Sequence, residues 1–415
     1  MTMHLRAICL FAFLALTTAC HPAPVRVSSA PTGCPVVKPG EPRLDALEVV
    51  TTIPVETDLE PRGSLPTHGV WREMLQGART RVDLWHFYLT TQKGSRLEPV
   101  IAELAAAARR GVRVRLLIDK KMSQNSSDTL ALLRRLPGIR IAAFDGKAFG
   151  GGVLHAKAML VDGREAYLGS ANFDWRSLEH VHETGLRISS PAVVSALEQM
   201  FELDFRLARG QANAWDCARS SPAFAFPPRV RLVASPAPWL PRGVGKALDA
   251  LVELIDGARK EITVQLLSYV LRSYHDKKPF NDIDEALRRA AGRGVKVRIL
   301  VSDWNLSRGQ IWGIRGLAEV QGVEVRFVSI PQARSGYIPF ARVLHSKVLR
   351  VDDSISWVGT SNWSGSYFRT SRNVELIVED LKVARTLSGL FEDLWSGKYA
   401  TKLDPTKQYR APKHD

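Results

Sequence analysis

The residues best suited to chemistry occur in two copies of one short motif. The first copy holds His155, Lys157, Asp162, Ser170 and Asn172, and the second holds His345, Lys347, Asp352, Thr360 and Asn362. Each residue of the second copy lies 190 positions after its counterpart, because 345 − 155 and 362 − 172 are both 190. A single His-x-Lys pair arises readily by chance, whereas a repeat that keeps all five positions indicates a shared function.

These residue types suit the cleavage of a phosphodiester. His and Lys two positions apart on a strand point to the same face, so each copy presents one imidazole and one ammonium group. Lys and Asn can stabilise charge on the non-bridging oxygens of a five-coordinate phosphorus. One His can attack phosphorus while the other protonates the leaving oxygen, and the roles reverse when water hydrolyses the phosphohistidine. We therefore predict one active site shared by both copies.

Carboxylates are expected to support the two motifs in two ways. A carboxylate beside a catalytic His orients the imidazole and holds its tautomer. Glu183 and Glu375 follow their motifs at closely similar distances, and we predict that they have this role. We include Asp162 and Asp352 in the same set of site residues. We expect them to support the backbone of the motifs on the side away from the reacting groups.

The elements that must position the motifs also repeat. We expect helices at 71–78, 95–108, 244–258 and 282–292, and strands at 81–89, 112–118, 261–270 and 295–301. Ser95 and Glu98 have the spacing of a capping box at the start of the second helix. Strands that alternate with helices at this spacing indicate α/β domains with a largely parallel, two-sided sheet.

We predict an α/β fold with two similar domains, each a largely parallel or mixed sheet flanked by helices. Packing about a pseudo-two-fold axis would bring the two motifs face to face. The predicted ranges are a signal peptide at 1–19, a tether at 20–44, a first domain at 45–218, a Pro-rich linker at 219–228, a second domain at 229–400 and a C-terminal tail at 401–415.

The composition is that of a basic globular protein. Of the 415 residues, 45% are hydrophobic and 24% are charged, which excludes a long disordered or fibrous chain. The 57 Lys and Arg residues exceed the 42 Asp and Glu residues by 15. This excess points to a polyanionic partner, either nucleic acid or an anionic membrane. The alternative is a soluble enzyme from an Arg-rich lineage.

The N-terminus is typical of an export signal. A weakly basic start precedes an apolar run at 7–16 that is too short to span a bilayer. Residues 16–20 resemble a bacterial lipoprotein cleavage site that would leave Cys20 lipidated, although Thr17 stands where such sites prefer Leu. Secretion after cleavage behind Ala19 is the alternative. Both interpretations place the mature protein outside the cytoplasm, either anchored to the membrane at its periplasmic face or secreted.

Two cysteines remain once Cys9 and Cys20 are assigned to the N-terminal signal. In an oxidising compartment, Cys34 and Cys217 are expected to form a disulfide. A bridge across so long a loop would stabilise the fold by about 2–4 kcal/mol. Two unpaired thiols are the alternative.

The duplicated His-x-Lys-x4-Asp motif resembles the phospholipase D superfamily over nearly all of residues 45–400. The resemblance implies a phosphohistidine route without a metal or other cofactor. Because the nucleophile of the family usually comes from the first copy, it also implies that His155 is the nucleophile and His345 the acid/base. The flanks at 167–177 and 359–368 look like the branch of animal lysosomal five-prime exonucleases and poxvirus envelope phospholipase-like proteins, which act on single-stranded nucleic acid and in some cases on phospholipid.

Three functions remain open. A nuclease is favoured by the positive charge and by the flanks of the motif, and we predict a metal-independent phosphodiesterase that acts on single-stranded nucleic acid. A phospholipase D or transphosphatidylase, including cardiolipin-synthase-like transfer, is favoured by the predicted lipid anchor. A non-catalytic anion-binding lipoprotein would keep its biological effect after replacement of both motif histidines.

Weaker patterns have simpler explanations. His180 and His182 lie beside Glu183 and could suggest a metal site, but we interpret them as histidines at a strand edge. Aromatic residues occur at or after strand ends, where α/β active sites gather, and they are Trp85, His86, Tyr88, Tyr269 and Trp304. They could stack bases, line a lipid channel or simply pack in the interior.

Overall fold

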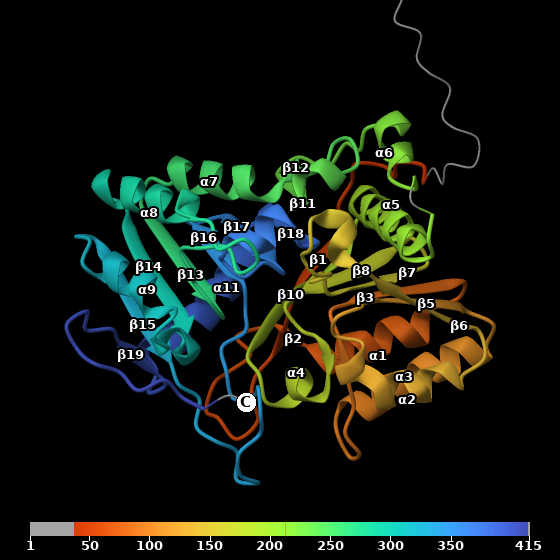
Figure 1. Cartoon of the computed structure of the whole chain (residues 1–415), viewed down its shortest axis with the longest axis horizontal. Coiled ribbons are helices and arrows are strands. Elements are labelled where there is room, and N and C mark those ends of the chain that lie inside the picture. Colours follow the sequence, from red (N-terminus) through yellow and green to blue (C-terminus); the bar gives the residue numbers. More distant parts are fainter. Residues whose placement is uncertain (1–36, 212, 414–415) are drawn as a thin grey trace, which may run out of the picture.

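A computed structural model describes residues 37–211 and 213–413, which form two α/β lobes that lie side by side (Figure 1). Within these residues, the sheet of the first lobe has the strand order β2-β1-β10-β8-β7-β3-β5-β6. The sheet of the second lobe has the order β12-β11-β18-β17-β16-β13-β14-β15-β19. The two orders match except for the extra edge strand β19. The predicted α/β fold with two similar halves is therefore confirmed.

The first lobe contains most of the expected elements. Its strands are β1 (Ala46–Thr52), β2 (Leu65–Pro66), β3 (Arg81–His86), β5 (Arg113–Asp119), β6 (Ile139–Phe144), β7 (Ala158–Val161), β8 (Glu165–Gly169) and β10 (Glu183–Ser189), with a separate pair β4 (Leu89–Thr90) and β9 (Phe173–Asp174). Its helices are α1 (Thr67–Gly77), α2 (Leu97–Arg109), α3 (Ser127–Arg134), α4 (Trp175–Glu179), α5 (Pro191–Ala208) and α6 (Asp216–Ser220), with short 3-10 turns η1 (Gln124–Ser126) and η2 (Gly146–Phe149).

The second lobe repeats this order. Its strands are β11 (Val230–Ser235), β12 (Gly245–Lys246), β13 (Glu261–Leu266), β14 (Lys296–Ser302), β15 (Val323–Val328), β16 (Val348–Val351), β17 (Ile355–Gly359), β18 (Asn373–Glu379) and β19 (Ala400–Lys402). Its helices are α7 (Ala247–Gly257), α8 (Asp282–Gly292), α9 (Ile311–Ala318), α10 (Gly365–Arg369) and α11 (Leu381–Ser396), with 3-10 turns η3 (Ala237–Trp239) and η4 (Asp303–Leu306).

Each sheet is mixed, and its parallel pairs are confined to particular strands. In the first lobe, β3, β5 and β6 pair in parallel, as do β1 and β2, and the other neighbours pair antiparallel. Parallel neighbours need a helical crossover, whereas antiparallel neighbours such as β7 and β8 can be joined by a tight turn. Each motif therefore encloses a hairpin, β7–β8 or β16–β17, beside the crossover strands. The expected placement of His and Lys on a strand is wrong, because both pairs lie just before β7 and β16.

Local details differ from expectation at the start of α2. The Ser95 hydroxyl has no hydrogen-bond partner among the described residues, and Arg96 is the residue that precedes the helix. Glu98 instead accepts the backbone N–H of Gly94 at 2.8 Å. The predicted capping box is wrong. The Glu98 carboxylate accepts a hydrogen bond from the turn before the helix, and the Ser95 hydroxyl does not cap the helix.

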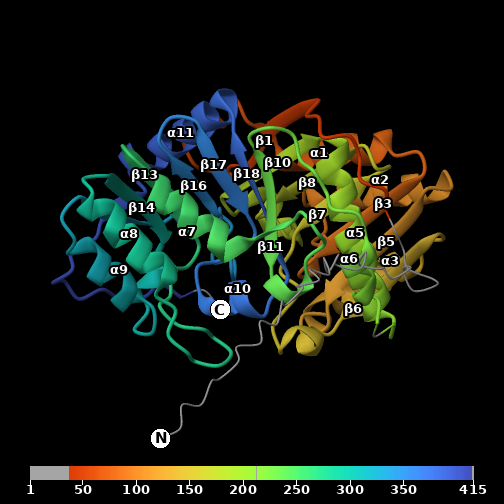
Figure 2. The same ribbon diagram turned by 90° about the horizontal axis from the view of Figure 1, so that it is seen from above.

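One hydrophobic core crosses the junction of the lobes. Leu168 and Leu186 of the first lobe are buried in the same cluster as Val358 and Val374 of the second. The strands β1, β10, β11 and β18 lie together at the centre of the molecule in both views (Figures 1 and 2). Burial of apolar surface shared by both lobes holds them in a fixed relation.

A buried ion pair also links the lobes. The Arg372 guanidinium donates to both carboxylate oxygens of Asp204 on α5, at 2.8 and 3.1 Å. The same guanidinium donates to the carbonyl oxygens of Ser235 and Trp239. Because neither charged side chain is exposed, loss of one partner would leave the other charge uncompensated in the interior. Arg372 directly precedes β18, so the pair positions the strand that reaches the junction.

Several predictions at the ends of the chain concern residues that the structure does not describe. The signal peptide, Cys20 and Cys34 lie outside the described residues. Cys217 is disulfide-bonded, and its predicted pairing with Cys34 stays a prediction. The exact domain boundaries also stay predictions, although β19 shows that the segment after Tyr399 adds an edge strand to the second sheet. No helix in the described part of the chain combines the length and apolar character needed to cross a membrane.

Candidate active site

Each motif histidine is held at the junction by backbone of the opposite lobe. The N–H of His155 donates to the carbonyl of Arg372, and the N–H of His345 donates to the carbonyl of His182, both at 2.9 Å. The two contacts are equivalent under the offset of 190 residues, since 182 + 190 is 372. The lobes thus bring the two motifs together about a pseudo-two-fold axis, and His182 contributes to this junction.

Both imidazoles line one cavity of about 470 Å³. Glu183, Asn172 and Asn362 line the same cavity. Aromatic rings from both lobes form much of its wall, and they are Phe87, Tyr88, Trp304, Phe340 and Tyr367. A concave site of this size, with few polar groups among apolar ones, is typical of ligand-binding and active sites.

The two imidazoles have different partners. Nδ1 of His345 lies 2.8 Å from Oε2 of Glu183, whereas Nδ1 of His155 lies 3.0 Å from Oδ1 of Asn373. Both partners come from the lobe opposite their histidine. In each case Nδ1 is engaged, which leaves Nε2 as the nitrogen that can act in the cavity. The site is therefore symmetric in position but contains only one orienting carboxylate.

The predicted role of Glu375 is wrong. Its carboxyl accepts a hydrogen bond from the Ser361 hydroxyl and does not contact a histidine, and its Oε2 has no partner among the described residues. The constant offset identifies the true counterpart of Glu183, because 183 + 190 is 373. Sequence reasoning missed Asn373 because it looked for a second carboxylate and did not apply the offset to that position.

Burial raises the pKa of Glu375 to about 8. Below pH 4.5, the pKa of this group in the unfolded chain, the Glu375 carboxyl is protonated in both states and does not oppose folding. As the pH rises from 4.5 towards 8, the unfolded chain loses this proton but the folded protein keeps it, so the free energy of unfolding falls. We expect Glu375→Gln to match the wild type near pH 4.5 and to be more stable above pH 8, by roughly 5 kcal/mol. Thermal unfolding of both proteins across this pH range measures the difference. A constant difference in stability at all pH values would contradict the assignment.

Hydroxyl groups hold the orienting side chains in place. Ser170 and Ser177 donate to the two oxygens of Glu183, and Thr360 donates to Oδ1 of Asn373. Ser170 and Thr360 were predicted as site residues, and the structure places them behind the cavity. Their hydroxyls fix the groups that in turn fix His345 and His155.

The two motif lysines are fully buried beside the histidines. Each ammonium group donates to the carbonyl oxygen of its own motif histidine, Lys157 to His155 and Lys347 to His345. Burial and the charge of Lys347 hold the pKa of Lys157 well below its usual value. Burial also lowers the pKa of Lys347 to about 7, although Glu183 opposes this shift. An anion in the cavity would relieve the mutual repulsion of the two ammonium groups.

Burial also controls the charge of the two histidines. Burial, with Lys157 and Lys347, holds the pKa of His155 well below its usual value. Burial lowers the pKa of His345 to about 4, and the charge of Glu183 acts in the opposite direction. Glu183 itself has a lowered pKa, because His345, Lys347 and Ser170 outweigh its own burial. His345 is thus the imidazole beside a carboxylate that favours its protonated form.

The two motif asparagines are available to a ligand. Both side chains line the cavity, and Oδ1 of Asn172 and of Asn362 has no hydrogen-bond partner among the described residues. An amide can present either its oxygen or its N–H groups, depending on the orientation of the side chain. Two amides that face the cavity from opposite lobes can therefore donate to the non-bridging oxygens of a phosphodiester.

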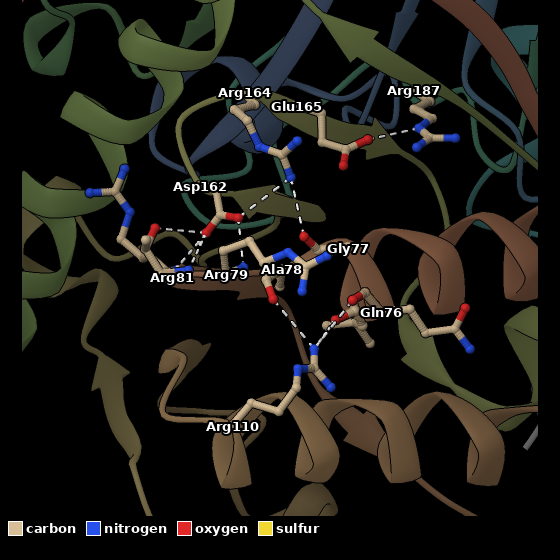
Figure 3. Close-up of polar contacts among 12 residues, drawn as sticks. Gln76, Gly77, Ala78, Arg79, Arg81, Arg110, Asp162, Arg164, Glu165 and Arg187 are labelled. Atoms are coloured by element: carbon tan, nitrogen blue, oxygen red, sulfur yellow. Dashed lines mark hydrogen bonds and ion pairs between the residues drawn. The ribbon is translucent and has the colours of Figure 1, made fainter.

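The motif aspartates lie outside the cavity and brace the hairpin turns behind it. Asp162 accepts the backbone N–H groups of Arg79, Thr80 and Arg81 at 2.7–2.8 Å (Figure 3). Asp352 makes the equivalent contacts to the N–H groups of residues 259–261. Both aspartates adopt positive φ angles of 55° and 51°, and Asp tolerates this left-handed conformation better than most residues. These contacts tie each hairpin to the turn before β3 or β13.

The remaining aromatic and histidine residues fall into two groups. Tyr88 and Trp304 line the cavity, whereas Trp85, His86 and Tyr269 are buried away from it. Sequence reasoning missed Phe87 and Tyr367, whose ring centroids lie 5.0 and 4.7 Å from that of His155. Within the described part of the chain, no group of three or more His, Cys, Asp and Glu side chains could hold a metal ion.

The fold and site define a class of protein in which two α/β lobes share one cavity, lined by one motif histidine from each lobe with a buried motif lysine beside each histidine. A family profile described as "Cardiolipin synthase, PLD-like domain" matches residues 71–205 and 251–395. The chain belongs to the phospholipase D superfamily, and it is a phosphodiesterase of that superfamily.

Similar proteins carry two kinds of name. Phospholipase D Z of Dictyostelium discoideum is 30% identical over 86% of this chain and 90% of its own length. The "5'-3' exonuclease PLD3" of Bos taurus is 33% identical over 81% of this chain and 76% of its own length. Among solved structures, phosphatidylserine synthase of Haemophilus influenzae aligns with a TM-score of 0.58 at 14% identity, covering 81% of this chain and 85% of that one. At this identity the structural likeness concerns the fold alone.

Proposed function

We propose that this protein hydrolyses single-stranded nucleic acid through a phosphohistidine intermediate and without a metal ion. The observation that carries the proposal is the single cavity that contains both oriented imidazoles. His155 and His345 reach it from opposite lobes, so one phosphodiester placed between them contacts both. The two buried lysines beside them suit an anionic transition state.

The different partners of the two histidines support different roles. Asn373 is neutral and accepts from Nδ1 of His155, so it orients this ring without favouring a second proton. Glu183 is a carboxylate and stabilises the imidazolium form of His345. His155 is thus suited to attack with an unprotonated Nε2, and His345 is suited to carry a proton.

The proposed reaction has two steps. Nε2 of His155 forms a bond to phosphorus, the bond to the leaving oxygen breaks, and His345 transfers its proton to that oxygen. Water then attacks the phosphohistidine, His345 accepts a proton from the water, and the bond between phosphorus and His155 breaks. The product phosphate leaves and both histidines return to their starting states. Each lysine and asparagine acts by stabilising charge on the non-bridging oxygens.

The wall of the cavity supports nucleic acid as the substrate class. Aromatic rings from both lobes surround the two histidines, and stacking of bases on such rings is a common and sequence-tolerant means of binding single strands. The net charge of +15 favours a polyanion. The similarity to proteins named 5'-3' exonucleases points in the same direction.

Phospholipid is the second candidate substrate. Met122, Leu267 and Val343 also line the cavity and could contact an acyl or glycerol group. The similarity to a protein named Phospholipase D Z supports this alternative. Transfer of the phosphatidyl group to an alcohol would be the distinguishing reaction, because an alcohol can replace water in the second step.

The two substrates can be compared directly. Purified protein that lacks residues 1–20 is incubated in EDTA with end-labelled single-stranded DNA, and separately with phosphatidylcholine and ethanol. Shortening of the DNA that is lost in His155→Ala establishes the nuclease. Formation of phosphatidylethanol without cleavage of DNA establishes the lipid enzyme and overturns the proposal. Loss of activity caused by EDTA alone contradicts the metal-free route.

The optimum pH is expected to be acidic. The free enzyme needs His155 without a proton on Nε2 and His345 with one, and burial lowers the pKa of both residues. Above the pKa of His345 the protonated fraction falls as the pH rises, so kcat/KM should decrease by about tenfold per pH unit between about pH 5 and pH 7. Above pH 7 the loss of charge on Lys347 adds to the decrease. A profile of kcat/KM that rises steadily above pH 8 would contradict these assignments.

We also propose that the protein acts outside the cytoplasm, attached through lipid on Cys20. The support is the N-terminal pattern and the disulfide at Cys217, a bond that persists in oxidising compartments. Mass spectrometry of the mature N-terminus distinguishes a lipidated Cys20 from cleavage without lipid. A cytoplasmic protein with its first residues intact would overturn the proposal.

A further inference from the structure

A second cavity adjoins the catalytic one. It has a volume of about 380 Å³, and its wall includes Lys93, Trp175, His180, Tyr337 and Pro339. The catalytic cavity is lined by the neighbours Arg176 and Phe340, so two segments of chain contribute consecutive residues to the two cavities. Consecutive Cα atoms are only about 3.8 Å apart, which makes the cavities adjacent.

A single ridge separates the two cavities. Arg176 on α4 donates to the carbonyl oxygen of Pro339 at 3.1 Å, which joins the first lobe to the loop of the second. The Arg176 guanidinium also lies 6.0 Å from the centre of the Phe340 ring, and Phe340 is 47% exposed. The ridge thus presents the aromatic face of Phe340 between the two cavities, while the charge of Arg176 is paired with Asp174 at 2.8 Å.

The pseudo-symmetric position on the other side of the site is filled. Under the offset of 190 residues, His180 in the wall of the second cavity corresponds to Thr370. A Cβ on Gly151 would lie 2.3 Å from Nε2 of His275, and a Cβ on Gly152 would lie 2.1 Å from the carbonyl oxygen of Thr370. The His275 ring therefore packs against the glycine backbone where the first lobe leaves a hollow. These contacts close that side, whereas the side of Lys93 and Tyr337 extends the catalytic cavity.

The wall of the second cavity has the chemistry of a single-strand binding site. Lys93 is exposed and can pair with a phosphate, and Trp175 offers aromatic surface. The 38% exposed Tyr337 ring has the Lys413 ammonium 5.1 Å from its centroid, and the wall also includes the acidic side chain of Glu179. His180 is nearly buried, and its Nδ1 has no hydrogen-bond partner among the described residues. Stacking surfaces that alternate with cations bind successive nucleotides without reading their sequence.

We propose that the second cavity binds the part of a single nucleic-acid strand that continues beyond the scissile phosphodiester. The proposal rests on the nuclease function proposed above. One strand passes from the catalytic cavity over the ridge of Arg176 and Phe340, and its next phosphate and base occupy the space between Lys93 and Tyr337. The closed side at His275 leaves the strand one direction in which to extend.

The experiment compares two double variants on two substrates. Lys93→Ala with Tyr337→Ala removes the cation and an aromatic ring of the second cavity. Lys277→Ala with Trp312→Ala is the matched control, because both of its residues are exposed and lie outside both cavities. The substrates are a twelve-nucleotide single strand and thymidine 5'-p-nitrophenyl phosphate, which is too small to fill both cavities.

We expect the cavity variant to raise KM for the twelve-nucleotide strand by about tenfold or more, as the loss of one stacked base and one phosphate contact implies. Its kcat/KM for the small substrate should stay within about twofold of the wild type, which also shows that it folds. The control should match the wild type on both substrates. Equal KM values of the cavity variant and the wild type for the long strand would overturn the inference and leave the nuclease intact. Failure of the wild type to cleave the strand would overturn the nuclease itself.

Discussion

Replacement of His155 by Ala is expected to lower kcat by about 10⁴-fold or more, because it removes the proposed nucleophile. The imidazole is 3% exposed and lines the catalytic cavity. Asn373 and two aromatic rings contact it and fix its orientation. The measurement is kcat on a phosphodiester with a p-nitrophenyl leaving group. No covalent intermediate should form in this variant.

His345→Ala is the informative comparison for this variant. The p-nitrophenolate ion leaves without a proton, so a variant without the acid can still complete the first step. We expect a burst of p-nitrophenol equal to the concentration of active sites, followed by very slow turnover, since water then lacks a base. His155→Ala should show no burst. A burst from His155→Ala and none from His345→Ala would reverse the assigned roles.

Glu183→Gln is expected to lower kcat/KM by about 10³-fold without unfolding the protein. The carboxylate accepts from Nδ1 of His345 and also from Ser170 and Ser177. An amide of the same shape can accept at one atom only, and its NH₂ group can force the imidazole into the wrong tautomer. In a serine protease triad, the equivalent substitution of Asp by Asn costs about 10⁴-fold. Kinetics at the optimum pH, together with thermal unfolding, measure both parts of this prediction.

Two variants act as controls for Glu183. Glu375→Gln changes a buried carboxyl of the second lobe. This carboxyl does not contact a histidine, so the variant should keep the wild-type kcat/KM. Asn373→Asp gives His155 a carboxylate partner, which should raise the pKa of His155 and move the acidic limb of the pH profile to higher pH. Equal losses in Glu183→Gln and Glu375→Gln would show that burial of the carboxyl, and not its contact with His345, determines the effect.

The sequence predicted that the two motifs meet at one cavity, because their spacing repeats without insertion. The offset of 190 from His155 to His345 extends through the asparagines, so the amino-acid sequence alone aligns the two half-sites. It also applies to Glu183 and Asn373, yet we predicted the orienting role for Glu375, which follows His345 by 30 residues, where Glu183 follows His155 by 28. The expectation of a second carboxylate overrode the spacing, although a neutral amide also fixes a tautomer.

Other features could not be predicted because they depend on contacts between the lobes. Phe87 and Tyr367 come from different lobes and meet only at His155. The second cavity combines the loop after β4, the two ends of α4 and the loop that follows β15, and none of these segments carries the repeated His-x-Lys pair. Ser170 was predicted as a site residue, and its contact with Glu183 depends on how β10 pairs with β8. Periodicity identifies strands and helices, but it does not specify which loops meet.

Trapping of the covalent intermediate tests the central claim most directly. The wild-type protein is mixed in EDTA with a p-nitrophenyl phosphodiester, quenched in alkali, in which a phosphohistidine survives, and digested for mass spectrometry. We predict one modified peptide per chain, in which Nε2 of His155 is bonded to phosphorus that keeps its second ester group, and none in His155→Ala. Turnover without any adduct, or an adduct on His345 alone, would contradict the mechanism.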